Sequence, residues 1–298
     1  MATAASDQKR QALRRYIIRE IEPEPAVQSV VVIGSVAQGT AQPDSDVDAV
    51  VFLDPFDPYA VPAECQWCPA DGSYHSTASE IPRARQCLQL DFARLDLSVW
   101  IDPSYVWPEG RRAELASGWI AFDRSGWIIE LITARTHYAS SLREDRLDTT
   151  ITWLNQHLSG DRPCQTWKEL GPTVAHDRLN AAHTSLVQAL FAYHRRWQPW
   201  RNRRMSALLA LPWLPEDFET RIQTAMLAPS PDYEGYAIRV EALRGLFQDL
   251  LDHLISQGDY GDDPISEAFI RSHDEPGRSW NMDAWCREHR ARSIRRHR

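Results

Sequence analysis

The feature that most constrains the fold is a pair of apolar segments separated by a Gly-Ser dipeptide, with two aspartates in alternate positions at the second. Residues 30–33 form a β-branched run typical of a buried strand, and Gly34 and Ser35 follow it directly. After a spacer of ten residues come Asp46 and Asp48. Because side chains at positions i and i+2 of a strand share one face, both carboxylates are predicted to point the same way.

These residue types are typical of a site for a metal ion and a phosphate. Two carboxylates on one face suit Mg²⁺, which prefers oxygen ligands and keeps coordination positions for substrate phosphates. Residues 36–41 are predicted to form at least one helical turn, which would place Gly34 and Ser35 at its N-terminus, where unpaired N–H groups favour an anion. The alternative is a structural strand pair with exposed aspartates, but two such charges would repel each other without a cation between them.

The segment from Ile33 to Ala49 resembles the signature of the nucleotidyltransferase superfamily with the DNA-polymerase-β-like fold. That signature is a hydrophobic residue, Gly-Ser or Gly-Gly, a spacer, and then Asp-hydrophobic-Asp. The resemblance, with a third acid, covers the N-terminal third of the chain and implies an enzyme that uses ATP and Mg²⁺. It implies metal-binding and catalytic roles for Asp46 and Asp48, and nucleotide contacts for Gly34, Ser35 and Ser45.

The resemblance also implies a third carboxylate on a neighbouring strand, because two metal ions need more than two such ligands. Asp96 is the preferred candidate for metal binding and catalysis. Its surroundings alternate polar and apolar residues, as expected of a strand over 95–101 with Asp96 on the polar face. Asp91 is the rival, on an earlier strand of a hairpin that turns near residues 93–94. With Asp96 as the third acid, Asp91→Asn is expected to leave activity largely intact.

The hydrophobic periodicity changes once along the chain and predicts two domains. Strands are expected at 28–33, 47–53 and 95–101. Beyond Asp102, apolar residues recur every three or four positions, as in packed helices. We therefore expect an α/β nucleotidyltransferase catalytic domain, a mixed sheet with flanking helices, over residues 1–110. An all-α helical bundle that binds substrate is expected over residues 111–298.

The net charge of the chain limits the class of acceptor molecule that we expect. The chain has 298 residues and a formal net charge of −8, which disfavours a nucleic-acid template, since proteins that bind phosphate backbones need clustered cations. An acidic surface suits a cationic small molecule instead. We expect AMP transfer from ATP to a hydroxyl of such a molecule, and size, architecture and charge resemble the aminoglycoside and lincosamide nucleotidyltransferases of antibiotic resistance. The alternatives are a protein-AMPylating, antitoxin-type nucleotidyltransferase and a non-catalytic nucleotide-binding protein of the same fold.

Location and partners follow from composition. No apolar run approaches the roughly 20 residues that span a bilayer, and residues 1–20 lack the apolar core of a signal peptide, so a cytoplasmic protein is expected. The five cysteines are an odd number, which favours reduced thiols over a disulfide framework. The expected partners are a nucleoside triphosphate and a cationic acceptor, without nucleic acid or membrane, and with a homodimer as a possible assembly.

Residues 54–94 contain a second possible metal site. Cys65 and Cys68 have the Cys-x₂-Cys spacing of a zinc element, and His75 and Cys87 would complete four ligands. The spacing between this second pair is not one of the recognised zinc patterns. The alternative is a set of reduced cysteines in a flap over the nucleotide site.

Three further features of the C-terminal half admit both functional and structural interpretations. The Arg/Trp-rich run over residues 195–204 could contact a triphosphate and a base, or complement the end of a helix. Lys168 is one of only two lysines and could contact a phosphate. A general base is expected near the cleft, with the candidates Glu130, His176 and Asp177 left open.

Overall fold

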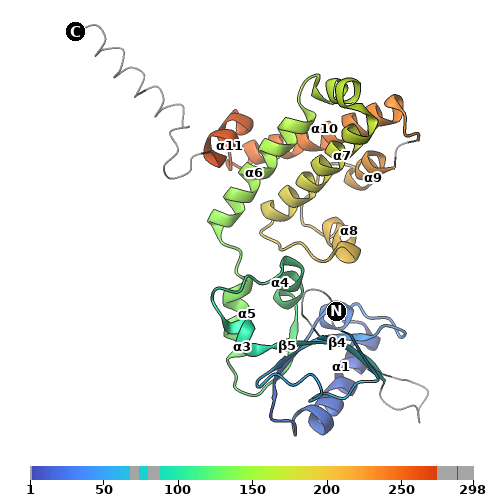
Figure 1. The fold of residues 1–298 in the computed structure, drawn as a ribbon, viewed down its shortest axis with the longest axis vertical. Coiled ribbons are helices and arrows are strands. Elements are labelled where there is room, and N and C mark those ends of the chain that lie inside the picture. The colour runs from blue at the N-terminus through green and yellow to red at the C-terminus, as the bar shows by residue number, and fades with distance from the viewer. Residues whose placement is uncertain (1, 68–73, 80–87, 228, 274–286, 288–298) are drawn as a thin grey trace. The chain divides into compact units, whose positions relative to one another are not determined.

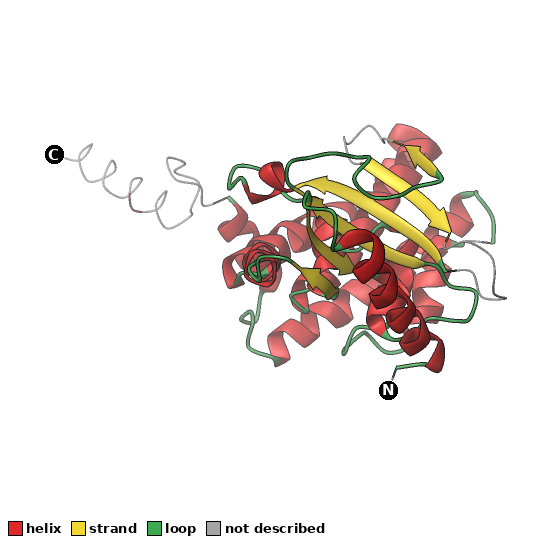
Figure 2. Cartoon of the chain, turned by 90° about the horizontal axis from the view of Figure 1, so that it is seen from below, coloured by secondary structure: helices red, strands yellow, loops and turns green. Residues whose placement is uncertain are grey.

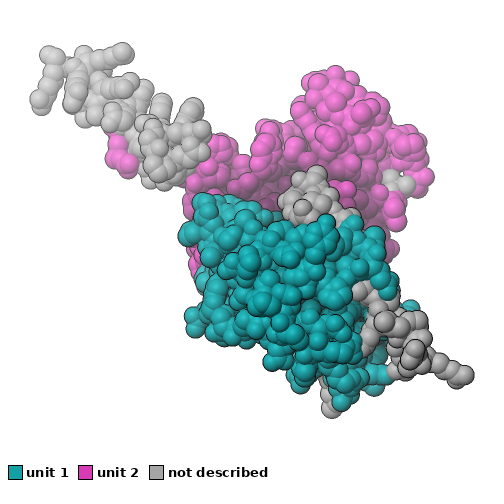
Figure 3. Space-filling model, turned by 60° about the horizontal axis from the view of Figure 1, so that its bottom comes forward, with its two compact units in different colours: residues 1–137 teal, residues 138–298 magenta. Residues whose placement is uncertain are grey.

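The computed structural model describes residues 2–67, 74–79, 88–227, 229–273 and 287, and the chain divides into two compact units. The first unit is Met1–His137 and the second is Tyr138–Arg298. Figure 3 shows each unit in its own colour. Each unit has a hydrophobic core of its own, and each is described by itself.

Within the described residues, the first unit contains a six-stranded mixed sheet in the order β3-β4-β5-β2-β1-β6. Figure 2 shows the strands in yellow. β2 and β5 are parallel, and the other neighbouring strands are antiparallel. The strands are β1 (Val27–Val32), β2 (Val47–Leu53), β3 (Cys65–Trp67), β4 (Tyr74–Ser79), β5 (Gln89–Asp96) and β6 (Trp119–Asp123).

Helices cover both faces of this sheet, as Figure 1 shows. They are α1 (Ala4–Tyr16), the π-helix η1 (Ile17–Ile21), α2 (Gly34–Gln38), α3 (Leu97–Ile101), α4 (Glu109–Ala116) and α5 (Ile128–Thr136). Leu13 of α1 packs on one face with Val30 of β1, while Trp100 of α3 packs on the other face with Val31. The strands alternate their side chains between the two cores, so burial on both faces explains their nearly continuous apolar sequences.

The second unit is helical and has a single core cluster within its described residues. Its helices are α6 (Ser140–Leu158), α7 (Arg162–Tyr193), α8 (Arg201–Leu209), α9 (Phe218–Met226), α10 (Tyr233–Ser256) and α11 (Pro264–Ser272). Leu186 and Leu190 of α7 pack with Leu243 and Leu250 of α10, at the helical spacing seen in the sequence. The observed architecture confirms the predicted fold class, a mixed α/β domain followed by a helical one.

A buried polar network holds the end of this unit together. Asp148 of α6 is 4% exposed and accepts hydrogen bonds from the Tyr260 hydroxyl at 2.6 Å and from Arg271 Nε of α11 at 2.9 Å. A second bond from Arg271 Nη2, at 2.9 Å, makes the pair bidentate. Because both carboxylate oxygens are satisfied, the buried charge is compensated rather than isolated.

Two boundaries differ from those expected from the sequence. The division between units falls after His137 rather than after residue 110, because β6 pairs with β1 and Ile128 of α5 packs in the core of the sheet. The expected strand over 95–101 is wrong, because β5 covers Gln89–Asp96 and residues 97–101 form α3. The hairpin turn expected near residues 93–94 is also wrong, since β5 runs straight through these positions. No helix among the described residues is both long and apolar enough to cross a membrane.

Candidate metal centre

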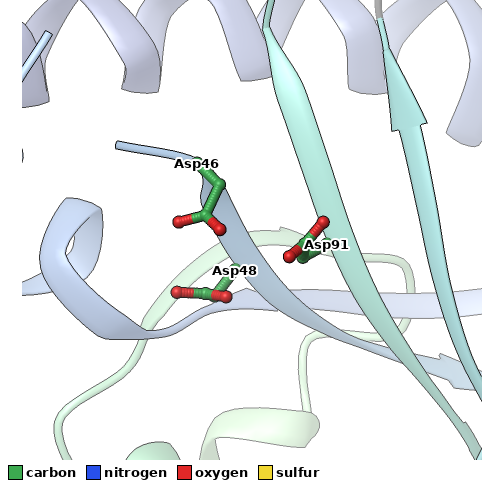
Figure 4. A group of neighbouring side chains, drawn as sticks. All are labelled: Asp46, Asp48 and Asp91. Atoms are coloured by element: carbon green, nitrogen blue, oxygen red, sulfur yellow. The ribbon is translucent and has the colours of Figure 1, made fainter. Parts of the chain in front are cut away.

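Three half-buried carboxylates meet at the N-terminal ends of the two central strands, β2 and β5. Asp46 directly precedes β2, Asp48 lies in β2, and Asp91 lies in β5. One oxygen from each residue lies within 4.8 Å of the others. Figure 4 shows the three side chains gathered together.

The parallel pairing of β2 with β5 brings Asp48 and Asp91 together. Asp48 is the direct partner of Asp91, and Val50 is the partner of Ala93 two residues further on. Val50 and Ala93 pack in the same core cluster. Because side chains two positions apart share a face, Asp48 and Asp91 lie on that face too, just beyond the edge of the apolar core.

The electrostatics of the cluster favour a cation. Burial, and then the nearby charge of Asp46, raise the pKa of Asp91 above its usual value. Asp91 Oδ1 is buried and has no hydrogen-bond partner within the described part of the chain. An unsatisfied carboxylate oxygen beside two further acids fits a hard divalent cation such as Mg²⁺, which would supply the missing partner and offset the repulsion.

Gly34 makes room for this arrangement. Its φ is +65°, and a Cβ built at this position would lie 2.6 Å from Asp48 Oδ2. A side chain here would therefore clash with an acid of the cluster and would also strain the backbone. The close approach of the Asp48 carboxylate therefore explains why glycine is required at position 34.

Ser35 and Ser45, the two serines predicted to contact the nucleotide, have different structural surroundings. Ser35 is in the first turn of α2, and its carbonyl oxygen accepts the Thr40 N–H at 2.9 Å. Ser45 lies in the turn before β2, and its hydroxyl accepts the N–H of Gln42 at 2.9 Å. Ser45 therefore helps to shape the turn that leads into Asp46, and a contact from it to a nucleotide stays a prediction.

The third acid of the cluster is Asp91, and Asp96 is not brought to it. Asp96 is opposite Leu53, at the other end of the β2–β5 pairing. It caps α3, accepting from the Ser98 N–H at 2.9 Å and from the Ser98 hydroxyl at 2.6 Å. The step from Asp91 to Asp96 along the strand is an odd number of positions, so the two side chains also face opposite sides of the sheet. Asp91 therefore replaces Asp96 as the candidate third metal ligand.

The proposed zinc ligands are only partly described. Cys65 is an exposed free cysteine on β3, paired with Thr77 in the sheet, and His75 on β4 is paired with Trp67. Cys68 and Cys87 lie outside the described residues. The zinc site therefore stays a prediction.

The candidates in the helical unit have local partners. His176 Nδ1 lies 2.8 Å from Arg239 Nη1, and this nitrogen must accept because the guanidinium only donates, so His176 positions a buried arginine. Lys168 forms a hydrogen bond with Cys164, a contact that raises the pKa of the lysine. Trp197 is buried against Tyr138, with ring centroids 4.7 Å apart. The general base stays open among the candidates predicted from the sequence.

The fold and the acid cluster together define the class of the N-terminal unit. The elements of a nucleotidyl-transferring domain are present: a Gly-Ser turn follows β1, and three acids cluster at the start of β2 and in β5 of a mixed sheet. Residues 14–98 match the family model of the nucleotidyltransferase domain, so this part of the chain is similar to the nucleotidyltransferase superfamily.

Likeness to individual proteins is more distant. The chain is similar to a nucleotidyltransferase-like protein of Exiguobacterium sibiricum of known crystal structure, at 13% sequence identity and a TM-score of 0.43. The likeness covers 90% of this chain and 81% of that one, and it is too weak to inform the activity. No curated protein sequence matches the chain.

Proposed function

We propose that the protein transfers AMP from ATP to a hydroxyl group of a small-molecule acceptor. The observation that carries the proposal is the meeting of Asp46, Asp48 and Asp91 within 4.8 Å, inside a domain of the nucleotidyltransferase family. A domain that only bound nucleotide would gain nothing from three carboxylates that repel one another. The cluster is costly unless a cation is part of its function.

The residues of the cluster have distinct tasks in this proposal. Asp46, Asp48 and Asp91 would hold Mg²⁺, which when bound neutralises charge on the triphosphate and activates the attacking hydroxyl. Gly34 keeps the space beside Asp48 open, and the main-chain N–H groups at Gly34 and Ser35 are the proposed phosphate contacts. Holding the nucleotide and acceptor in line then supplies the entropic part of catalysis.

A cationic acceptor, such as an aminoglycoside-type antibiotic, fits this centre best. The chain has a formal net charge of −8, and its candidate centre is acidic. A negative field concentrates positive ligands, and this attraction weakens with salt over a Debye length of about 8 Å at physiological ionic strength. An amine-bearing sugar supplies both the positive charge and the hydroxyl group.

The test is incubation of the full chain with labelled ATP and Mg²⁺ against aminoglycosides, lincosamides and a cell lysate, followed by mass analysis. The expected product is an aminoglycoside heavier by one AMP, together with pyrophosphate. Label found only on lysate proteins would contradict the small-molecule acceptor and favour protein AMPylation. The same reaction is run in parallel with each of the other three nucleoside triphosphates. Absence of transfer from all four would contradict the proposal that the protein is a nucleotidyltransferase enzyme.

A further inference from the structure

A cavity of about 590 Å³, open to solvent, lies within the helical unit and includes Arg195 from the Arg/Trp-rich run. Its walls include Arg143 of α6, Tyr193 at the end of α7, Trp213 in the loop after α8, and His253 of α10. Figure 1 labels these four helices. The volume lies within the range of about 300 to 1,000 Å³ that is typical of small-molecule sites.

One wall of the cavity is aromatic. The rings of Trp213 and His253 are stacked, with centroids 3.6 Å apart and planes at 7°. The Tyr193 ring stands at 68° to Trp213 and 75° to His253, and its hydroxyl lies 2.8 Å from His253 Nε2. His194 Nε2 lies 2.8 Å from the carbonyl oxygen of Trp213, so this nitrogen must carry the proton and donate. These contacts fix the wall in place before any ligand arrives.

The charges around this wall are positive on balance. Arg143 and Arg195 line the cavity together with one acid, Asp259. Asp259 is already paired with Arg143, at 2.7 Å between Oδ2 and Nη2. Burial lowers the pKa of His194 and of His253, which keeps both imidazoles neutral at neutral pH. Arg195 is therefore a cation without a matching anion among the described residues of the cavity wall.

Arg195 also occupies an unusual backbone position. Its φ is +51°, in the left-handed region, where the chain leaves α7. The Arg195 N–H bonds the carbonyl of Ala192 at 3.0 Å and the Arg196 N–H bonds that of Phe191 at 2.9 Å, so the residue closes the end of the helix. Glycine is the usual residue for such a helix end, because it has no Cβ to strain. An arginine here costs backbone strain, which is consistent with a need for its side chain.

The Arg195 guanidinium is weakly held in the structure. It is exposed, and its contact with the Ser140 hydroxyl is 3.4 Å long, at the limit of a hydrogen bond. Its fork is thus available for a bidentate contact with a carboxylate or phosphate, which is the geometry that guanidinium groups favour.

We propose that this cavity binds an aromatic anion, with a planar ring against the Trp213–His253 wall and a carboxylate or phosphate group on Arg195. Stacking on aromatic side chains and a charge-assisted contact recognise the two ends of such a ligand. A nucleoside monophosphate and an aromatic carboxylic acid both have this chemistry. The site is distinct from the acid cluster, which belongs to the other unit and repels anions unless a cation is bound.

The test is calorimetry on the full chain without Mg²⁺, in the Asp48→Asn background, so that binding at the acid cluster does not contribute. AMP and indole-3-acetate each carry a ring and an anion, adenosine and indole carry only a ring, and inorganic phosphate carries only an anion. At least one ring-plus-anion probe is expected to bind ten-fold or more tightly than the probes that lack either part. Binding of AMP alone would assign the nucleotide as the source of the chemistry, and binding of indole-3-acetate alone would assign the aromatic acid.

Arg195→Gly separates ligand recognition from folding. Glycine relieves the strain at the helix end, so the melting temperature is expected to hold or rise while affinity falls at least ten-fold. Arg201→Gln, which removes an exposed arginine of α8 outside the cavity, is the matched control and should keep the parent affinity. Equal binding of neutral and anionic probes, undiminished affinity in Arg195→Gly, or binding by none of the five probes would overturn the proposal. Because Mg²⁺ and the acid cluster take no part, these outcomes are independent of the nucleotidyl-transfer assay.

Discussion

Asp48 and Asp91 are direct partners across the parallel β2–β5 pairing. Neighbouring strands lie about 4.8 Å apart, so two carboxylates in this relationship are close enough to share one cation. The pairing also fixes the face on which they lie, because Val50 and Ala93, the next partners on that face, are held in the apolar core. The relative position of these two acids is thus set by the sheet, whereas Asp46 lies in the segment that directly precedes β2.

The role of Asp91 can be tested against Asp96 in the same strand. Asp91→Asn is expected to lower Mg²⁺-dependent pyrophosphate release by at least about 100-fold, because it removes a candidate metal ligand. Asp96→Asn should retain activity, since asparagine also caps a helix well and can accept from Ser98. If Asp96→Asn were inactive and Asp91→Asn active, the third acid of the proposal would be wrong.

The same Asp91→Asn variant should be at least as stable as the parent without metal. Burial and the charge of Asp46 raise the pKa of Asp91, so its ionised form is less favourable in the folded state than in the unfolded chain. The amide removes that cost. Thermal unfolding in the presence of a chelator provides the measurement, and a clear drop in melting temperature would show that Asp91 is structurally required.

Gly34→Ala is expected to disturb the acid cluster directly. A Cβ would lie 2.6 Å from Asp48 Oδ2 at a φ of +65°, so stability should fall by about 1 to 3 kcal/mol and pyrophosphate release should largely disappear. Gly126→Ala is the matched control, because Gly126 has a φ of +79° but no described atom within 4 Å of the added Cβ. It should show the backbone cost alone and keep its activity. Equal activity in both variants would show that the close approach of Asp48 to position 34 is not needed for catalysis.

The network around Asp148 is expected to be needed for the helical unit. Asp148→Ala removes the acceptor of both the buried Tyr260 hydroxyl and Arg271, so the free energy of unfolding should fall by about 3 kcal/mol. Asp145→Ala, at an exposed position of the same helix, should change it by less than about 0.5 kcal/mol. Chemical denaturation measures both, and similar losses in the two variants would argue against a special role for the network.

Replacing Arg94, a buried arginine without a matching acid, should not lower the free energy of unfolding, in contrast to replacing Asp148. Arg94 is 1% exposed and donates to the Val61 carbonyl at 2.7 Å, but its Nε and Nη1 have no partner among the described residues. Burial lowers the pKa of Arg94 to about 10. Arg94→Met should therefore leave the unfolding free energy unchanged or raise it by up to about 2 kcal/mol. Arg124→Met is the contrasting case and should destabilise, because Arg124 donates to three main-chain carbonyl groups.

The helical unit should lose stability in mild acid. Burial lowers the pKa of His183 and of His194 below their ordinary value of 6.5, so the unfolded chain binds these protons first. The stabilisation is present above pH 6.5 and is lost as the pH falls through the lower pKa values of the folded state. His183→Leu, at a helix position that otherwise packs in the core, should flatten this dependence between about pH 7 and pH 5. An unchanged slope in chemical denaturation at several pH values would contradict the role of His183.

The central strands and the helical core were predictable because their sequences have one strong period. The alternation around β2 indicated that Asp46 and Asp48 would share a face, and the structure brings them together. The prediction of a strand over residues 95–101 was wrong because the alternation of polar and apolar residues there also fits a short helix, in which Leu97 and Trp100 are buried three positions apart and Val99 is exposed. β6 was missed because its five residues are all only half-buried and carry little alternation. The Asp48–Asp91 partnership depended on the register of a parallel pair, which no local pattern encodes.

The parallel β2–β5 pairing also sets an order of assembly. β1 and β2 are antiparallel neighbours joined through α2, so their contacts are local and can form early. Asp91 reaches Asp48 only after the intervening chain has passed from one end of the sheet to the other, because parallel strands require a crossover. A chain that stops before β5 would therefore carry Asp46 and Asp48 but not the third acid of the cluster. The complete acidic centre is expected to arise together with this non-local pairing, so its formation reports on the docking of β5 against β2.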